Sequence, residues 1–464
     1  GNITGDSALT YVGPGTLILA GSNNYTGATN INGGTLAIAS DAEVNYGAGG
    51  NTLNGGNLQF NNYASTLALT GANIGLGAAN GTASSLSGTV SGGTLTFVGP
   101  GTLNLLASNN YSGPTNLNKG TLGITSDAAI NYGAGGINFN GGTLQFTNTT
   151  STLALSATNL SLGAATGAAS TLAGSITDGS AGPTVLTYSG PGSLVLTGIN
   201  TYTGTTNVPN GSLIVGSATA LPVDANVAIG TTTTAGTLTT TTIGKLELGT
   251  VGGTFVLGGI SVNSGSSLDI ADNPVLLTYT TTDPVATIAS YLTDGFNAGW
   301  SGGEIMSSAV AAANASQSKI SYSIGYADGA DGPNLTTLPP GTIEIMPTIA
   351  GDAKMQGNVV FGDFQILAQY FGMPGGWDEG NFKYGATVNF GDFQLLAQDF
   401  GQSSSGLTSG EIASLNSFAA EFGEALVANP GGGFSIVSVP EPASIGLLMV
   451  AGMIGLRRRR TSGD

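Results

Sequence analysis

The 464-residue chain contains neither cysteine nor histidine. Without histidine it cannot build a Ser-His-Asp triad, a Cys-His dyad or almost any catalytic zinc site, because imidazole is the base or the ligand in each. The absence of cysteine is typical of a large protein that crosses an oxidising compartment, where free thiols would form wrong disulfides. Together the two absences exclude the commonest hydrolytic and zinc-dependent chemistries.

Charge is also scarce, since only 8% of the residues are charged against roughly 25% in ordinary globular proteins. The formal net charge is −17, from 9 basic and 26 acidic residues. The basic residues before position 457 are Lys119, Lys245, Lys319, Lys354 and Lys383. A protein that binds nucleic acid needs a basic surface to neutralise phosphates. No such surface can form here, so we exclude nucleic acid as a partner.

Glycine is abundant, with 78 residues, and hydrophobic residues still make up 40% of the chain. The mean hydropathy is +0.22. The apolar residues come in short alternating runs bounded by Gly and Asn, a pattern that predicts many short strands joined by turns. The composition therefore indicates a folded, mainly β protein.

A long repeat organises the first half of the chain. The segment GPGTLILAGSNNYTGATNINGGTL begins at Gly13 (repeat 1) and returns at Gly99 (repeat 2) and Gly190 (repeat 3), at offsets of 86 and 91 residues. Leucines in the first two repeats keep internal spacings of 19 and 22 residues; they are Leu17, Leu36 and Leu58, then Leu103, Leu122 and Leu144. Such spacings predict a solenoid of strand-and-turn coils with these leucines stacked inside.

The fold that fits best is mainly β, a right-handed parallel β-helix followed by a small α-helical module and a C-terminal hydrophobic helix. Gly and Asn at the bends tolerate the positive φ that a coil needs to turn a corner. Asn30 and Asn32 are placed to form side-chain ladders at the corners. An array of β-sandwich domains is the alternative, because one immunoglobulin-like domain has about 100 residues. The regular coil spacing favours the β-helix.

The copies resemble the autotransporter-associated β-strand repeat, with the pattern G-x-G-T-L-x-L-x-G-x-N-x-Y-x-G-x-T-x-I-x-x-G-T-L. The matching residues in repeat 1 are Gly15, Thr16, Leu17, Leu19, Gly21, Asn24, Tyr25, Gly27, Thr29, Ile31, Gly34, Thr35 and Leu36. The resemblance covers residues 1–221 and implies a surface-exposed β-helical stalk, not an enzyme. GNITGDSALTYVGPGTL also matches SGTVSGGTLTFVGPGTL before repeat 2. Gly1 thus lies inside a repeat, and we expect further coils and a signal peptide upstream.

Parallel β-helices often carry polysaccharide lyases and hydrolases, so the acidic residues need separate attention. Hydrolysis needs two carboxylates facing one bond, and lyase chemistry needs a cationic base or an acid cluster that holds Ca²⁺. The acids of residues 1–263 are Asp6, Asp41, Glu43, Asp127, Asp178, Asp224 and Glu247. Asp41 and Asp127 are equivalent, and each lies in a Ser-Asp-Ala turn where we expect an Asx turn. Lys119 and Lys245 have no counterparts in the other copies, so we assign no catalytic residue.

Residues 222–345 are expected to form closing coils and a capping segment. Alternating apolar residues such as Leu246 and Leu248 still predict strands. Asp283-Pro284 predicts a helix start, with Asp as the N-cap and Pro at the first position. That helix is expected to reach about Leu292, and an alanine-rich stretch follows at 305–315.

Two related segments, GDAKMQGNVVFGDFQILAQYFG and GNFKYGATVNFGDFQLLAQDFG, lie 29 residues apart within residues 350–401. They resemble the dockerin type I pair, in which a twelve-residue loop like that of an EF-hand leads into a helix. The resemblance implies calcium ligands at Asp352 and Asp363 in the first loop. In the second loop it implies Asn381, Asn389 and Asp392.

The ligand pattern departs from that family at two positions of each loop. Lys354 and Lys383 occupy the third positions, and Gln356 and Gly385 occupy the fifth. An ammonium group repels Ca²⁺ and offers no lone pair, but it could form an ion pair with the carboxylate at position twelve of its own loop. Two alternatives stay open, a helical pair without a cofactor and a weakened calcium site. The family also implies a cohesin-like partner.

Residues 402–438 are expected to form a Ser-rich linker and an amphipathic helix. Ile412, Leu415, Phe418, Phe422 and Leu426 keep helical spacing. We expect this helix to pack on the preceding pair, because its charges are all acidic, which disfavours a membrane surface.

Residues 439–464 contain Pro440, Glu441 and Pro442, an apolar run at 443–456, and then Arg457, Arg458, Arg459 and Arg460. This order, spacing and terminal position resemble the PEP-CTERM sorting signal. The 14-residue run would span about 21 Å as a helix, less than the ~30 Å hydrocarbon core. It suits a transient anchor with the arginines on the cytoplasmic side. The resemblance implies export, recognition by an exosortase-type sorting protease and cleavage near the motif.

The sequence therefore predicts a non-enzymatic exported stalk, structural or adhesive, sorted to the cell envelope or extracellular matrix. It would touch the inner membrane only transiently, through its C-terminus. The alternative is a module that binds extracellular polysaccharide through the loop pair or a flank of the β-helix. A polysaccharide-degrading enzyme is the least favoured hypothesis, because the catalytic ingredients are missing.

Overall fold

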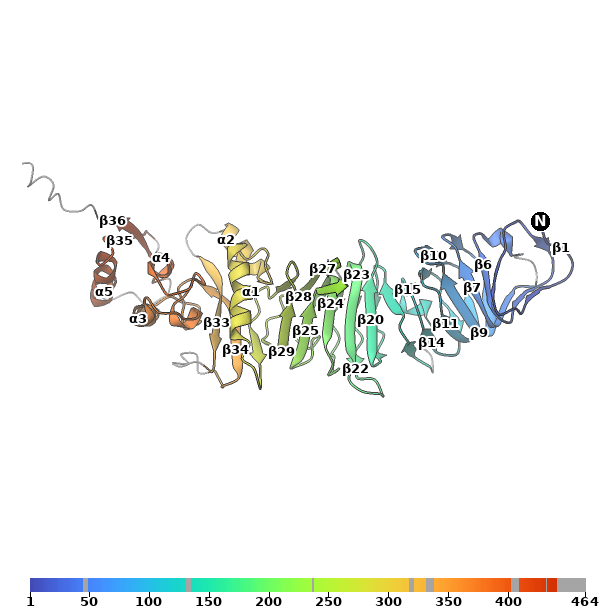
Figure 1. The fold of residues 1–464 in the computed structure, drawn as a ribbon, viewed down its shortest axis with the longest axis horizontal. Helices are drawn as coiled ribbons and strands as arrows, with labels where there is room; N and C mark the ends of the chain where they lie inside the picture. The colour runs from blue at the N-terminus through green and yellow to red at the C-terminus, as the bar shows by residue number, and fades with distance from the viewer. Residues whose placement is uncertain are drawn as a thin grey trace, which may run out of the picture. The chain divides into compact units, whose positions relative to one another are not determined.

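The computed structural model describes residues 1–44, 49–130, 135–235, 238–316, 321–330, 338–401, 409–430 and 432–439 (Figure 1). The chain forms two compact units. Residues 1–284 and 297–308 make up the first, and residues 285–296 and those from 309 onward make up the second. The predicted sorting tail, with Pro440, Glu441, Pro442 and Arg457 to Arg460, lies outside the described residues.

The first unit is a parallel β-solenoid of about 12 coils. Figure 1 shows its strands following one another in chain order. The strands up to the end of the first long period are β1 (Thr4–Gly5), β2 (Leu9–Tyr11), β3 (Thr16–Ile18), β4 (Asn24–Tyr25), β5 (Thr29–Ile31), β6 (Thr35–Ile38), β7 (Asn51–Phe60), β8 (Ala64–Ser65), β9 (Leu69–Ala78), β10 (Ala83–Leu86) and β11 (Val90–Phe97). Those of the second are β12 (Thr102–Leu105), β13 (Asn110–Tyr111), β14 (Thr115–Leu117), β15 (Thr121–Ile124), β16 (Ile137–Phe139), β17 (Thr143–Phe146), β18 (Thr150–Ser151), β19 (Leu155–Ser156), β20 (Asn159–Ala164), β21 (Ala169–Leu172), β22 (Ile176–Thr177) and β23 (Val185–Leu196). The remaining strands of the unit are β24 (Thr206–Val215), β25 (Ala225–Ile229), β26 (Thr231–Ala235), β27 (Leu238–Thr242), β28 (Gly244–Leu248), β29 (Phe255–Val262), β30 (Ser267–Asp269), β31 (Val275–Thr278) and β32 (Ile305–Met306).

Apolar side chains stack in register through the solenoid interior. Leu103, Leu122, Leu144 and Leu162 are consecutive partners in parallel ladders, and each is at most 1% exposed. Burying one such side chain contributes about 1.5–3 kcal/mol. The predicted leucine stack of repeat 1 forms in the same way, with partners Leu17, Leu36 and Leu58. The prediction of a parallel solenoid is therefore confirmed, and the β-sandwich alternative is wrong, since sandwich sheets are antiparallel.

One glycine in each repeat permits the coils to approach. Gly34, Gly120 and Gly211 have φ values of 62°, 69° and 77°. A Cβ at these positions would lie 2.0, 2.1 and 1.9 Å from a carbonyl oxygen of the preceding coil. Only glycine tolerates both the left-handed backbone and this contact, which explains the recurring Gly before Thr-Leu or Ser-Leu.

The parallel ladder continues beyond residue 221 through β28, β29, β30, β31 and β32. One antiparallel hairpin, β26–β27, interrupts it. Because β24 pairs directly with β28, the hairpin is an insertion outside the stacked coils.

The second unit mixes helices with antiparallel hairpins. Its elements are α1 (Val285–Asn297), α2 (Ser308–Ser316), β33 (Tyr322–Asp328), β34 (Thr342–Ile349), α3 (Phe361–Tyr370), η3 (Trp377–Glu379), α4 (Phe390–Asp399), α5 (Ser409–Ala420), β35 (Glu424–Ala428) and β36 (Phe434–Ser438). The helix start predicted at Asp283-Pro284 is confirmed, and α1 extends past Leu292 to Asn297. No helix in the described residues is long and apolar enough to cross a membrane.

Helix α5 packs on the loop pair as predicted. The Phe418 ring lies 5.4 Å from that of Phe364 in α3 and 4.8 Å from that of Phe393 in α4, measured between centroids. The helix is shorter than its apolar spacing predicts, because Gly423 adopts φ 74° after Ala420. The prediction that helix continues to Leu426 is wrong, since Leu426 pairs with Ile436 in the β35–β36 hairpin.

Candidate functional site

An asparagine at the same place in each repeat links three successive coils. The buried Asn200 accepts a hydrogen bond from the Ile176 N–H (2.7 Å) and donates one to the Ala220 carbonyl (2.6 Å). The equivalent bonds join Asn23 to the Ile3 N–H and Glu43 carbonyl, and Asn109 to the Val90 N–H and Ala129 carbonyl. Each amide satisfies backbone groups of the coils on either side of its own, so the recurring asparagine is a structural link between coils.

A buried tyrosine–threonine pair follows that asparagine in every repeat. The hydroxyl-to-hydroxyl distances are 2.6 Å for Tyr25–Thr29, 2.5 Å for Tyr111–Thr115 and 2.6 Å for Tyr202–Thr206. Burial raises the pKa of Tyr202 to about 12, against the effect of the hydrogen bond to Thr206, which lowers it. The phenol is therefore a neutral partner for the threonine hydroxyl and not a proton-transfer group.

The repeat aspartates reach across coils instead of capping their own turns. Asp127 accepts hydrogen bonds from the Thr152 N–H (2.8 Å) and hydroxyl (2.9 Å). Asp41 accepts the same two bonds from Thr66, and no side-chain bond caps its own turn. The predicted Asx turns are therefore wrong, because the stacked neighbouring coil offers a donor pair that local sequence does not reveal. Both carboxylates serve cohesion between coils.

The positively charged Lys245 neutralises a buried acid. Its ammonium lies 3.0 Å from Glu247 and 3.2 Å from Asp269, which is fully buried; these are the ion pairs of the described residues. Burial alone would lower the pKa of Lys245, but the hydrogen bond to Glu247 and the Asp269 charge raise it overall. Asp269 also accepts a bond from the Ser308 N–H (3.0 Å). A lysine that stays protonated in this way is not a general base.

In the first loop of residues 350–401, Asp352 organises the backbone. Its carboxylate accepts hydrogen bonds from the Thr348 hydroxyl (2.6 Å) and from the N–H groups of Gln356 (3.1 Å) and Gly357 (2.7 Å). Gly357 occupies the sixth position at φ 76°, where EF-hand loops have glycine for a sharp turn. Asp352, which the sequence predicted as a candidate calcium ligand, thus fixes the loop backbone by hydrogen bonds from the first loop position.

The twelfth-position carboxylates make matching bonds in both loops. Asp363 accepts from the N–H groups of Lys354 (3.2 Å) and Val360 (2.8 Å). Asp392 accepts from the N–H groups of Lys383 (2.8 Å) and of its ninth position, Asn389 (2.8 Å). The expected ion pair with the lysine is absent from the described residues. The backbone N–H of the same lysine makes the contact instead.

The remaining candidates, Asn381 and Asn389, are also engaged internally. Asn381 accepts from the Gly385 N–H (2.8 Å) and donates to the Gly375 and Gly385 carbonyls. Asn389 caps α4 by accepting from the Gly391 N–H (2.8 Å). The two loops also share a non-glycine residue with positive φ at the fourth position, Met355 (52°) and Tyr384 (55°).

Burial raises the pKa of Asp363 to about 6, opposed by its backbone hydrogen bonds. Burial likewise raises the pKa values of Asp352 and Asp392. Within the described residues, no group of three or more acidic side chains converges as a metal cluster. The third and fifth positions of both loops lack the oxygen ligands of an EF-hand loop.

Trp377 is a supporting residue that the sequence pattern did not reveal. Its fully buried indole donates from Nε1 to the Asp352 carbonyl (2.8 Å) and packs on Phe382 and Tyr384 at 5.1 and 5.8 Å between ring centroids. It lies in η3 between the two loops, where no repeat or spacing marks it. In the sequence, the signal for the geometry of the first loop was Gly357 at its sixth position.

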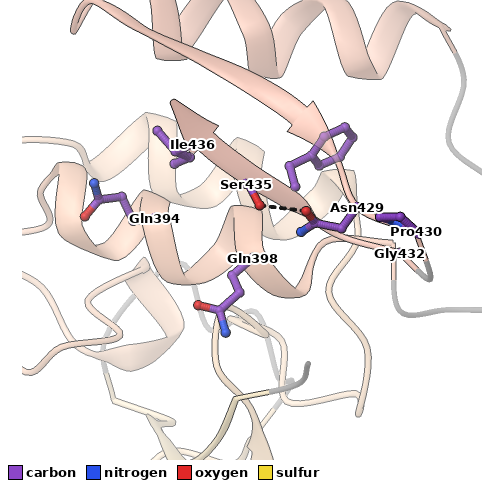
Figure 2. Close-up of a pocket in the computed structure, with 8 residues that line it drawn as sticks. Gln394, Gln398, Asn429, Pro430, Gly432, Ser435 and Ile436 are labelled. Atoms are coloured by element: carbon purple, nitrogen blue, oxygen red, sulfur yellow. Dashed lines mark hydrogen bonds between the residues drawn. The ribbon is translucent and has the colours of Figure 1, made fainter. Parts of the chain in front are cut away.

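A groove of about 580 Å³ lies between α4 and the β35–β36 hairpin (Figure 2). Gln394 and Gln398 come from α4, and Asn429, Ser435 and Ile436 come from the hairpin. The Ser435 hydroxyl donates to the Asn429 side-chain oxygen at 2.6 Å. The described residues that line this groove include no titratable side chain, so it can recognise a ligand by hydrogen bonds but cannot supply acid–base catalysis.

These features define a β-solenoid built from a long sequence repeat. Three segments match the family model for the passenger-associated-transport-repeat, at residues 9–38, 98–124 and 186–215. Each segment contains the asparagine, tyrosine and threonine that link or brace the coils. The resemblance of the repeats to this family is thereby confirmed.

One curated relative is the adhesin BmaC autotransporter of Brucella suis biovar 1 (strain 1330), which is 36% identical over 130 residues. The match covers 26% of this chain and 4% of that protein. The chain thus spans a small fraction of the relative's length. No solved structure matches the chain.

Proposed function

We propose that this chain is a non-enzymatic, exported surface protein whose solenoid is a structural or adhesive stalk. The observation that carries the proposal is the use of the repeat's polar residues. The asparagine and the tyrosine–threonine pair of each repeat hydrogen-bond within or between coils, and so does the aspartate of the first two repeats. Side chains used in this way stabilise a long stack.

The adhesive role draws on the named activity of the relative. That protein is an adhesin, and its match to this chain is in line with a shared surface role. The enzymatic alternative lacks a supporting feature. The carboxylates of Asp41, Asp127 and Asp178 are engaged by threonines, and those of Glu247 and Asp269 by Lys245.

The proposal is tested in the native host. Cells that carry the chain should expose it to added protease, and a deletion strain should adhere less to surfaces until the gene is restored. A protein that stays protected from protease in intact cells would contradict surface exposure. If the protein is accessible on wild-type cells but the deletion strain adheres normally, the adhesive role is contradicted. The structural role then remains.

The C-terminal tail is the proposed means of sorting. An exosortase-type protease would cleave near Pro440, Glu441 and Pro442 while Arg457 to Arg460 hold the segment oriented in the membrane. Mass spectrometry of the protein from its host should find a C-terminus near residue 440. A variant with alanine at positions 440, 441 and 442 should keep its tail. Intact protein ending at or after Arg460 in the membrane fraction would show a lasting anchor instead.

A polysaccharide-binding role is the second candidate. It is favoured by neutral, amide-lined grooves, of which the one in Figure 2 is an example. Amide groups offer both a donor and an acceptor, as hydroxyl-rich polymers do.

A further inference from the structure

The parallel ladder of the solenoid is broken at one place in repeat 2. In repeat 1, β7 pairs with β9 along its length, with Asn51 opposite Leu69, Thr52 opposite Thr70 and two irregularities between Thr52 and Asn57. With an offset of 86 residues, β7 corresponds to β16 and β17, and β9 corresponds to β19 and β20. The second halves, β17 and β20, still pair, so the break affects only the first halves, β16 and β19. Within the described residues, β16 pairs with β14 and β19 pairs with β22, and the two are not partners of each other.

A glycine of repeat 1 is replaced by alanine at the break. Gly71 in repeat 1 has φ 153°, and a Cβ there would lie 1.8 Å from the Leu53 carbonyl oxygen. The equivalent residues in repeat 2 are Ala157 and Phe139. Because alanine carries that Cβ, its strand cannot approach the Phe139 carbonyl as closely, and the two coils separate locally.

An insertion beside the break forms a fixed wall. The offset between repeats grows from 86 to 91 residues because of five additional residues before Val185. Thr184 is fully buried, and its hydroxyl donates to the Ala157 carbonyl (2.5 Å). The exposed Asp178 accepts from the Thr184 N–H (2.8 Å), which lowers the pKa of Asp178, and the Ser156 hydroxyl donates to the Asp178 carbonyl (2.8 Å). The inserted loop is therefore held against the opened strand.

A groove of about 310 Å³ lies at this break. Its polar walls are Asn138, Asn140, Ser156, Asn159 and Ser180. The side-chain NH₂ groups of Asn138 and Asn140 donate to Asn116 (2.8 Å) and Asn118 (2.9 Å), which orients both amides. Asn159 has no side-chain hydrogen bond to any described residue. The groove thus presents oriented amide oxygens on one wall and a free amide on the other.

We infer that this groove binds a neutral saccharide segment. Amides and hydroxyls match the donor and acceptor character of sugar hydroxyls, and the half-buried Phe139 adds an apolar surface, as ligand sites commonly do. No charged side chain is among the described residues that line it, so it offers nothing to an acidic polymer. An extended peptide is disfavoured because the open edge of β16 is only three residues long. Insertions in solenoid repeats commonly map to the binding face. The inference rests on the proposed surface function and names a ligand class for it.

The test is calorimetric titration of the full chain with a panel of neutral glucan, galactan, mannan and xylan oligomers, with an alginate oligomer and an extended peptide as comparison ligands. We expect at least one to bind, and the double variant N140A/N159A to bind about tenfold more weakly because it loses hydrogen bonds to the ligand. The matched control is N54A/N73A, the same two exposed positions in repeat 1, where the ladder is closed. It should bind as the wild type does, and both variants should keep the wild-type circular dichroism spectrum.

Absence of binding to every oligomer of the panel would overturn the inference. So would equal affinity in N140A/N159A and the wild type, or an equal loss in the repeat 1 control. Preference for an acidic oligomer such as alginate, or for an extended peptide, would also overturn it. These results would leave protease exposure and adhesion of whole cells unchanged, so failure of the groove is distinguishable from failure of the proposed function.

Discussion

Asp41 and Thr66 are 25 residues apart in the chain, yet the Asp41 carboxylate accepts hydrogen bonds from the Thr66 N–H at 2.8 Å and from its hydroxyl at 2.9 Å. Asp127 binds Thr152 with the same geometry and the same separation. Asp178 and Thr203 repeat the arrangement a third time, again 25 residues apart. Three carboxylates therefore each fix a contact between neighbouring coils. Asp41 and Asp127 are positional equivalents, whereas Asp178 lies in the second repeat as well, just before repeat 3 begins.

Replacing this aspartate should loosen the coil contact. We expect Asp127→Ala to lower the free energy of unfolding by about 1–2 kcal/mol, because it removes two charge-assisted hydrogen bonds at a partly exposed site. Asp127→Asn should lose less, since one acceptor oxygen remains. Hydrogen exchange at the Thr152 amide, together with urea unfolding, measures both effects. Lys119→Ala, at an exposed position, is the control, and equal exchange rates in D127A and K119A would disprove the role of the carboxylate.

Replacing the buried Asn200 should lower the free energy of unfolding more than replacing Asp127. Asn200→Ala leaves the Ile176 N–H and the Ala220 carbonyl without a partner in a buried site, and we expect a loss of about 2–3 kcal/mol. Asn207→Ala, on the outward side of β24, should cost less than about 0.5 kcal/mol. Thermal unfolding and amide exchange at Ile176 distinguish the two. A loss in N200A no larger than in N207A would mean that water replaces the amide.

Calcium should have little effect on the loop pair as it stands. Lys354 and Lys383 occupy oxygen-ligand positions, and the carboxylates of Asp363 and Asp392 already accept backbone N–H groups. The variant with Asp at positions 354, 356, 383 and 385 should gain a calcium-dependent melting temperature, because these changes restore third- and fifth-position ligands. The measurement is the melting temperature of the protein and of the variant, each with calcium and with a chelator. A gain of several degrees in the unaltered protein at about 1 mM calcium would contradict the prediction.

Asp399 should make the second unit more stable in mild acid than at neutral pH. Burial raises the pKa of Asp399 to about 7, opposed by the hydrogen bond from the Ser321 N–H. An unfolded aspartate titrates near pH 3.9, so the stabilisation from the protonated form is complete below about pH 4 and is lost as the pH rises to about 7.

Asp399→Asn should remove this part of the pH dependence. The variant should match the wild type at about pH 4 and exceed it at about pH 8 by an amount on the order of a few kcal/mol. Asp363, whose pKa is raised to about 6, contributes equally to the pH dependence of the unfolding free energy in both proteins. Urea unfolding followed by the fluorescence of Trp377, in a Trp300→Phe background, reports on the second unit. Parallel pH profiles for the two proteins would show that Asp399 is not the group responsible.

The loop pair shows how much of a candidate site can be predicted from the sequence pattern alone. The spacing of the two copies predicted that Asp352 and Asp363 belong to one loop, and Asn381, Asn389 and Asp392 to the other. In the structure, the carboxylates at the twelfth position of the two loops accept matching backbone N–H bonds. Spacing could not show that backbone N–H groups, rather than lysine ammonium groups, contact the carboxylates, because that depends on how the loop closes against its own helix.

The sequence by itself determined the coil architecture of the first 221 residues and the helix start at Asp283-Pro284. These follow from short-range periodicity, from the 19- and 22-residue leucine spacings and from local capping chemistry. Only the tertiary structure decided the partners of Asp41 and Asn200 and the opening at Ala157. The partners of Asp41 and Asn200 lie 20 to 25 residues away along the chain and become neighbours through stacking. A polar side chain in a solenoid bonds to the donor or acceptor that the adjacent coil places beside it, and one added Cβ between coils is enough to change that placement.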